Sequence, residues 1–444
     1  HALTGRLPDI PRTPAQRVVP PTIWRVHIGQ TALRRRALLK ATVLGAALAC
    51  SPAQYRTLLA GPVARGAGPY GALLGPDANG LLLPKGFRSR IVAVSGLRVG
   101  LVDGASPYVW HPAPDGAACF PEADGGWRYV NNSEVAGGQG GVGGIRFAPD
   151  GSTLEAYSVL EGTSRNCAGG VTPWGTWLSC EEAGDGGQVW ECAPDGSWEG
   201  VPHPMLGLYN HEAVAVDPVN QHLFLTEDDP GGLFYRWVMA EGRFDDAIAN
   251  GRMRADGPED GTLQAAVMAE DGAVEWVDLP DPTATPLRDS VDATRFDGGE
   301  GIWYDSGFVY FTTKGDNRVW VHDIAGQRIS VLYDGVEDPE GGLAGVDNVT
   351  IAPSGDVLVA EDGGNMEIRM ITADTREVVP LVRLPGPAHE GSEVTGPCFS
   401  PDGTRLYFSS QRAGLDGPGE GITYEVTGPF RTERVGIAAT ATPS

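Results

Sequence analysis

The sequence predicts an all-β fold, and a six-bladed β-propeller is the architecture that it favours. The 444 residues include 63 Gly and 35 Pro, which leaves little room for long helices, while a hydrophobic fraction of 41% is ample for a large core. In addition, one hairpin-like unit recurs along the chain at a period typical of propeller blades. The length from about residue 87 to residue 430 allows six or seven such blades.

The recurring unit consists of two short runs of alternating apolar residues, joined by a turn such as Pro-Asp-Gly or Pro-Ser-Gly. The alternation is typical of strands, and these residue types are typical of tight turns. Copies that begin at 300, 347 and 393 are spaced by 47 and 46 residues, a regularity that a β-sandwich would not show. The copies are 140–158, 211–229, 300–316, 347–363 and 393–411.

The limits of this pattern predict the domain organisation. We expect the propeller over 86–430, a linker over 51–85 and a tail over 431–444. Hairpins are hard to find between 245 and 292, and we interpret this stretch as an inserted loop or subdomain.

The segment 34–50 resembles a twin-arginine export signal. Arg35 and Arg36 precede the apolar run 37–49, which is shorter than the roughly 20 residues of a membrane span. We therefore expect export without stable membrane insertion. Residues 1–33 are interpreted as upstream or n-region sequence whose translation is left open.

The small residues at 47–49 offer a cleavage site directly before Cys50. Cleavage there predicts a periplasmic or extracellular protein, and lipid anchoring at Cys50 is the alternative. The six cysteines contain no C-x-x-C pair, so an exported chain is expected to form disulfides, with Cys167 and Cys192 as one plausible local pair.

The charge of the chain restricts its partners. It carries 57 acidic and 33 basic residues, a formal net charge of −24, which argues against binding nucleic acid or an anionic membrane. An anionic substrate would need an intervening cation. We expect a monomer that acts on a small molecule.

Acidic residues recur at one position of the repeat, the start of the strand expected to line the channel. Residues at the same phase of successive blades would lie on one ring about the axis. Several buried carboxylates would repel one another unless cations were bound between them. The residues that fit this phase are Glu212, Glu300, Asp347, Asn348 and Glu393.

Two earlier segments fit the same phase more loosely, namely Glu134 and the cluster of Cys180, Glu181 and Glu182. Oxygen ligands suit Ca²⁺, whereas a thiolate at Cys180 suits iron or zinc. Any single acid is more simply explained as a solvated loop residue, but the set as a whole favours a metal cluster. There is no G-x-S-x-G or P-loop motif, and no G-x-G-x-x-G that follows an expected strand, to support a different chemistry.

Four segments resemble the PhoX family of bacterial alkaline phosphatases, in the order expected behind a twin-arginine signal. The resemblance extends over about 129–411, and its most specific parts are Trp-Gly-Thr-Trp before Cys180 and the pair Asp347-Asn348. The segments read TPWGTWLSCEE, NHEAVAVDP, VDNVTIAPSGDVLVAEDG and EVTGPCFSPDGTRLYFS.

The resemblance implies a six-bladed propeller that hydrolyses phosphate monoesters with Ca²⁺ and Fe³⁺ at one end of its channel. It implies that Cys180 binds iron, with Glu181 beside it, and that Glu212 and Glu300 complete the iron and calcium shells. Asp347 and Asn348 would bind calcium, and Glu134 and Glu393 would close the ring.

The sequence departs from the family pattern where an Arg-Pro-Glu-Trp run is expected to supply a phosphate-binding Arg. Residues 296–303 read FDGGEGIW, and Arg295 is the nearest arginine, with Arg318 further on. Either of these reaches the site, or the phosphatase activity is weak or absent.

Two other functions stay open at this point. One is a calcium-dependent lactonase-like propeller hydrolase, and the other is a non-catalytic propeller in which calcium fills the channel. We expect Cys180→Ser to abolish activity and iron binding in a phosphatase and to be nearly silent in either alternative.

Overall fold

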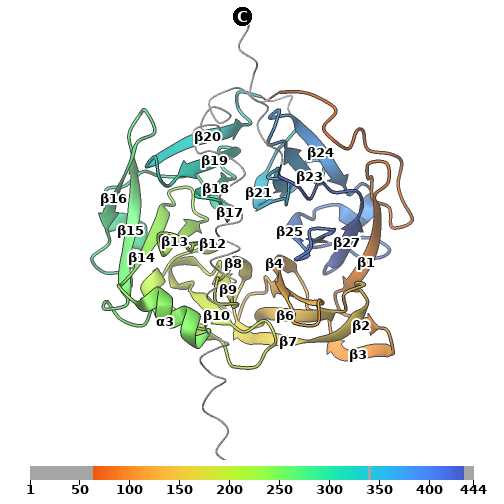
Figure 1. Ribbon diagram of the computed structural model, residues 1–444, viewed down its shortest axis with the longest axis horizontal. Coiled ribbons are helices and arrows are strands. Elements are labelled where there is room, and N and C mark those ends of the chain that lie inside the picture. The colour runs from red at the N-terminus through yellow and green to blue at the C-terminus, as the bar shows by residue number, and fades with distance from the viewer. Residues whose placement is uncertain (1–63, 339–341, 435–444) are drawn as a thin grey trace, which may run out of the picture. The chain divides into compact units, whose positions relative to one another are not determined.

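Six antiparallel sheets of four or five strands are arranged as blades around a central axis (Figure 1). The computed structural model describes residues 64–338 and 342–434. This arrangement confirms the predicted six-bladed all-β propeller. No helix among these residues is long and apolar enough to span a membrane.

Each blade begins with its innermost strand and continues outward, and we number the blades along the chain. Blade 1 contains β4 (Pro114–Pro121), β5 (Trp127–Ser133), β6 (Gly140–Phe147) and β7 (Thr153–Thr163). Blade 2 contains β8 (Asn166–Val171), β9 (Trp177–Glu181), β10 (Val189–Cys192) and β11 (Val201–Pro202). Blade 3 contains β12 (His211–Asp217), β13 (His222–Glu227), β14 (Phe234–Met239), β15 (Gly261–Met268) and β16 (Val274–Asp278). Blade 4 contains β17 (Gly299–Asp305), β18 (Phe308–Thr313), β19 (Arg318–Asp323) and β20 (Arg328–Asp334). Blade 5 contains β21 (Val346–Ile351), β22 (Val357–Glu361), β23 (Glu367–Ile371) and β24 (Val378–Arg383).

The sixth blade joins the two ends of the propeller. Its inner strands are β25 (Val394–Phe399), β26 (Arg405–Ser410) and β27 (Ile422–Thr427), and its outermost strand is β1 (Arg88–Val94), which pairs with β27. Because the first strand completes the last blade, the ring is closed by a ladder of main-chain hydrogen bonds. The strands β2 (Arg98–Leu101) and β3 (Gly104–Val109) form a separate hairpin.

The core lies between neighbouring blades, where apolar residues on alternate strand positions face each other. Between blades 3 and 4, the rings of Phe234 and Phe311 stack with their centroids 4.4 Å apart. A larger cluster between blades 2 and 3 includes Trp237, which is fully buried. These layers hold the inner strands in place around the axis.

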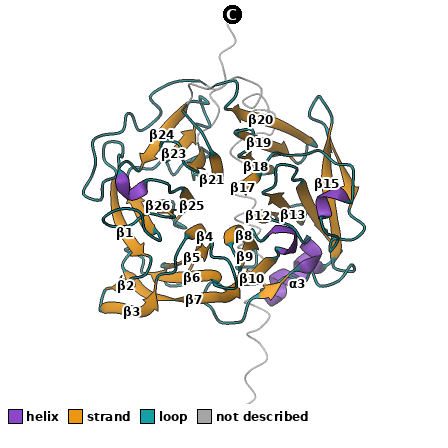
Figure 2. Cartoon of the chain, turned by 180° about the vertical axis from the view of Figure 1, so that it is seen from behind, coloured by secondary structure: helices purple, strands orange, loops and turns teal. Residues whose placement is uncertain are grey.

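The stretch 245–292 is not an inserted subdomain. It begins within α3 (Arg243–Asn250) and continues as the hairpin β15–β16, which extends blade 3 outward (Figure 1; α3 and β15 are also labelled in Figure 2). The sequence pattern did not reveal this hairpin because α3 and the connection 251–260 separate β15 from β14, the strand with which it pairs.

The described part of the predicted linker packs against the propeller. Leu81 and Leu83 are buried in a cluster with blade 5 and 6 residues, and Leu82 forms a bridge with Arg383. At the other end of the chain, Arg431 of the predicted tail donates two hydrogen bonds to the Asp356 carboxylate. The expected upstream region 1–33 and export signal 34–50 lie outside the described residues.

Glycine is required where the inner strands approach one another most closely. A Cβ at Gly116 would lie 2.5 Å from the Cα of Ala168, and one at Gly301 would lie 2.6 Å from the Cα of Asn348. At Gly396 it would lie 2.3 Å from the Asp115 carbonyl oxygen. Neighbouring inner strands are therefore in main-chain contact at this level.

We predict that Gly301→Ala destabilises the propeller by about 1–3 kcal/mol, the usual cost of overpacking, because a strand of blade 4 or 5 must move. Urea unfolding against the wild type measures this loss. The control is Gly100→Ala on the β2–β3 hairpin, where an added Cβ meets nothing within 4 Å. Equal stability of both variants would contradict the close approach.

Candidate metal centre

The inner strand of every blade begins with the same register. Its first residue pairs with the last residue of the second strand, as in Asn166 with Glu181 and Val346 with Glu361. In blades 1 to 5 the next two residues of the inner strand lie opposite a single residue of the second strand. This is a β-bulge, which redirects side chains and is frequent beside functional sites.

The first bulged residue of each of these five strands is an acid or a cysteine. In blade 6 the bulge comes one residue later, and the equivalent position is Thr395, which is still paired with Ser409. We call these six positions the inner ring. Its members are Asp115, Cys167, Glu212, Glu300, Asp347 and Thr395.

A second set of equivalent positions directly follows the second strand of each blade. We call it the outer ring, and its members are Glu134, Glu182, Asp228, Lys314, Asp362 and Gln411. The two rings interact: Gln411 donates hydrogen bonds from Nε2 to Asp115 at 2.5 Å and to Glu134 at 2.8 Å.

The rings bring together three groups of possible metal ligands. Within each group the ligand atoms lie within 4.8 Å of one another. The groups are linked, because Glu212 belongs to the first two and Asp347 to the last two. They are Cys167–Glu182–Glu212, Glu212–Glu300–Asp347 and Asp347–Asp362–Glu393.

Glu212 is the side chain that most needs a cation. It is only 1% exposed, and neither of its carboxylate oxygens has a hydrogen-bond partner among the described residues. Burial, followed by repulsion from Glu300 and Asp347, raises its pKa well above the usual value. An ionised Glu212 is costly to bury alone, so this set of carboxylates with one thiol fits bound metal.

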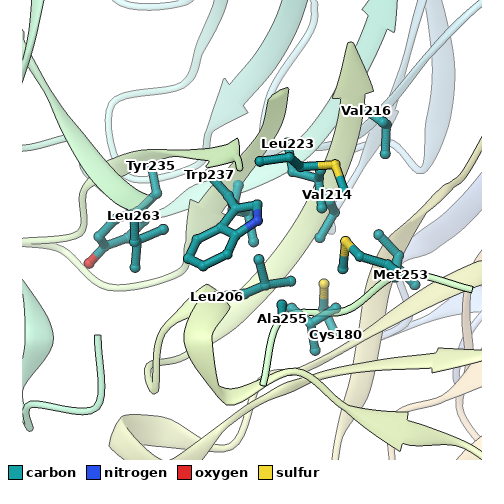
Figure 3. Packing of buried hydrophobic residues seen from close by; sticks show 14 of the residues in the cluster. Cys180, Leu206, Val214, Val216, Leu223, Tyr235, Trp237, Met253, Ala255 and Leu263 are labelled. Carbon is teal, nitrogen blue, oxygen red and sulfur yellow. The ribbon is translucent and has the colours of Figure 1, made fainter. Parts of the chain in front are cut away.

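The thiol of the inner ring is Cys167, not the predicted Cys180. Cys180 lies on β9 opposite the bulge, and its side chain is packed in the apolar cluster between blades 2 and 3, near Leu206, Met253 and Ala255 (Figure 3). Its equivalents in blades 1, 3 and 4 are structural. For example, Thr226 donates a hydrogen bond to the Glu300 carbonyl oxygen of the next blade.

The predicted Cys167–Cys192 disulfide is absent. The five described cysteines are all free, and Cys192 lies in an apolar cluster beside Trp177 while Cys167 faces the ring. Burial, together with the nearby Asp115, raises the pKa of the Cys167 thiol well above its usual value. A thiolate at this position therefore also needs a cation.

The remaining predicted ligands are divided between the site and the surrounding structure. The carboxylate of Glu181 accepts hydrogen bonds from the main-chain N–H groups of Ser164 and Gln188, so it anchors a loop. Its neighbour Glu182 belongs to the first ligand group instead. Glu393 joins the third group although it directly precedes β25. Asn348 accepts a hydrogen bond at Oδ1 from the Gly396 N–H, and Glu134 is held by Gln411 in the outer ring.

The predicted phosphate-binding arginine does not reach the rings. Arg295 donates a hydrogen bond to the Gly231 carbonyl oxygen, and Arg318 pairs with Asp316 and Asp334 on blade 4. The cations found at the rings are instead Lys314 and Arg412, which contact Glu300 and Glu393 at 2.7 Å each. Sequence reasoning missed them because they lie in turns after the second strand of their blades.

Below the inner ring, the channel contains a cavity of about 240 Å³. Its walls are mainly small or apolar residues of the inner strands, such as Ala168, Val214 and Pro397. Polar chemistry is therefore concentrated at the end of the channel where the inner strands begin.

The family model for alkaline phosphatase PhoX matches residues 128–331 and 324–414, which include most of both rings. The chain belongs to the PhoX family. PhoX enzymes are metal-dependent phosphatases, in agreement with the grouped acids of this propeller.

Among solved structures, one with a TM-score above 0.5 supports the propeller fold. Pseudomonas fluorescens PhoX in complex with vanadate, a transition state analogue, matches with a TM-score of 0.63 at 17% identity, over 80% of this chain and 97% of that chain. A gluconolactonase from Xanthomonas campestris matches with a TM-score of 0.45 at 14% identity, over 81% of this chain and 99% of that one. None of the curated proteins compared matches the sequence.

We predict that Cys167→Ala lowers the amount of iron or other thiophilic metal bound by this PhoX chain, whereas Cys180→Ala does not. Cys167→Ala removes a possible ligand atom from the inner ring. Cys180→Ala removes a sulfur atom from an apolar cluster that contains no member of the ligand groups. Elemental analysis of both purified variants measures the difference. Loss of metal from Cys180→Ala alone would restore the original assignment.

Proposed function

We propose that this chain is an exported phosphatase that hydrolyses phosphate monoesters with Ca²⁺ and Fe³⁺ bound at the inner ring. The observation that carries the proposal is the buried Glu212 carboxylate without a hydrogen-bond partner among the described residues. Membership of the PhoX family supports the reaction class. The small-molecule substrate and the monomeric state are part of the proposal.

The donor atoms suggest how the metals are distributed. The Cys167 thiolate and the Glu182 and Glu212 carboxylates would hold iron, because thiolates favour transition metals. The Glu212, Glu300 and Asp347 carboxylates would hold calcium, which favours oxygen ligands. When bound, such cations neutralise the acids, bind phosphate oxygens and stabilise the charge that develops during phosphoryl transfer.

The protein itself orients this chemistry. The inner-ring acids are almost fully buried, whereas Glu182, Asp228 and Lys314 of the outer ring are partly exposed. A substrate would therefore reach the site from the end of the channel where the inner strands begin. The neighbouring glycines hold the inner strands close together and fix the spacing of the acids. Cations held by these acids would also explain how a chain with a net charge of −24 attracts an anion.

The proposed export route would allow the chain to fold and bind its metals before it is secreted. PhoX proteins are typically exported, and the predicted twin-arginine signal carries folded proteins. Delivery to the periplasm or the extracellular space follows from cleavage before Cys50, and a lipid anchor on Cys50 remains the alternative outcome.

We predict that the protein secreted through its own signal contains iron and calcium and hydrolyses a chromogenic phosphate monoester at alkaline pH. Elemental analysis and the absorbance assay on the same preparation test this directly. Metal without turnover on phosphate monoesters would contradict the proposed reaction, and would leave the lactonase-like or the binding propeller.

We predict that Glu212→Gln lowers both bound metal and turnover by at least tenfold, because an amide has one neutral acceptor oxygen where the carboxylate has two charged ones. The control is Glu425→Gln on the sixth blade, an equally buried carboxylate paired with Arg90 and Arg405. It should keep its metal. Unchanged metal content in Glu212→Gln would contradict the central role of this residue.

A further inference from the structure

Lys314 is the basic residue among the six outer-ring positions, the other five being acids or an amide. Its Nζ lies 2.7 Å from Oε1 of Glu300 and 3.4 Å from Oδ2 of Asp362. These two acids belong to different ligand groups, Glu300 to the middle group and Asp362 to the group with Asp347 and Glu393. The ammonium group therefore stands between two candidate metal positions.

The third ligand group is the one in which side-chain cations contact the most acids. Lys314 pairs with Asp362, and Nη1 of Arg412 lies 2.7 Å from Oε1 of Glu393. Two of the three carboxylates in the Asp347–Asp362–Glu393 group thus have a cationic partner.

The two groups that contain Glu212 have fewer such contacts, because Glu300 is their one described member that forms an ion pair with a side-chain cation, Lys314. Glu182 accepts a hydrogen bond from the neutral amide of Asn210, and the Glu212 oxygens have no hydrogen-bond partner among the described residues. Charge compensation from the protein is therefore concentrated on the side of the rings formed by blades 4 to 6. The blade 2 and 3 side has a buried carboxylate that lacks it.

An ammonium ion and a divalent cation compete for the same oxygens. An ammonium group that forms an ion pair with a carboxylate repels a second cation from the same oxygens. A position that already has two side-chain cations is consequently a poor site for a metal ion.

We propose that Lys314 is a resident counter-ion that takes the place of a metal ion at the Asp347–Asp362–Glu393 group and confines metal to the Glu212 side of the rings. The inference rests on the proposed function, since it specifies which part of the same site binds metal. It assigns to a residue of this chain the charge that an additional divalent ion would otherwise supply.

The test compares Lys314→Met, which removes the charge but keeps the length of the side chain, with Lys314→Arg, which keeps the charge. Each protein is equilibrated with Ca²⁺, and the bound ions per chain are measured by elemental analysis and titration calorimetry. We expect Lys314→Met to bind one more Ca²⁺ per chain than the wild type, or the same number at least tenfold more tightly. Lys314→Arg should match the wild type.

Arg318→Met is the matched control, because Arg318 lies on the same blade and pairs with Asp316 and Asp334 outside the rings. It should leave Ca²⁺ binding unchanged. If Lys314→Met does not fold, Arg412→Met removes the other cation of the third group, and we expect it to increase Ca²⁺ binding as well.

Unchanged or weaker Ca²⁺ binding in Lys314→Met would overturn the inference, since the lysine would then not compete with a metal. A loss of inorganic phosphate binding without any change in Ca²⁺ would also overturn it, and would show that Lys314 contacts the substrate. If Lys314→Met binds an additional Ca²⁺ and the wild-type protein does not hydrolyse phosphate monoesters, the inference is supported and the proposed function is refuted. If the wild-type protein hydrolyses phosphate monoesters and Lys314→Met binds no additional Ca²⁺, the proposed function is supported and the inference is refuted.

Discussion

The β-bulge at the start of the inner strands is the local feature on which the site depends. All six blades begin with the same strand pairing, and in five of them the first bulged residue is an acid or a cysteine. A repeated backbone irregularity therefore produces a ring of similar side chains at one level of the channel. Neighbouring blades are held in step at this level, since Thr312 of blade 4 donates a hydrogen bond to the Asp347 carbonyl oxygen of blade 5. Blade 6 has its bulge one residue later, and Thr395 instead bonds to the Pro114 carbonyl oxygen of blade 1.

The same arrangement imposes an electrostatic cost that the fold itself only partly offsets. Burial and repulsion from neighbouring acids raise the pKa of Glu300 and of Asp347 well above their usual values. Burial alone would lower the pKa of Lys314, but attraction to Asp347 and Glu300 outweighs it and raises that pKa. Residues of blades 4 to 6 supply two cations to the rings, while Glu212 in blade 3 has none as a direct partner among the described residues. Metal binding and stability of the folded chain should therefore be coupled, because a cation bound to the native state alone stabilises it.

The sequence was sufficient to predict the architecture and part of the site, because both depend on a period. Turn residues and alternation repeat with the blades, and Glu212, Glu300 and Asp347 recur at one phase of that repeat. Cys167 was missed because β8 reads Asn-Cys-Ala-Gly-Gly-Val, a strand whose small residues permit close approach at the axis but give no apolar alternation. Cys180 was preferred because it lies in the family-like segment TPWGTWLSCEE, yet β9, which contains it, is the second strand of its blade.

Residues that depend on long-range packing could not be placed in this way. Arg295 is close to Glu300 in sequence, but its guanidinium turns toward the Gly231 carbonyl oxygen on a neighbouring loop. Lys314 is 14 positions from Glu300 in sequence and becomes its partner because β17 and β18 pair in the register that all the blades share. A cation at that outer-ring position meets the inner-ring acid of its own blade and the outer-ring acid of the next. The common register thus determines where a cation can replace a metal, just as it determines where the acids gather.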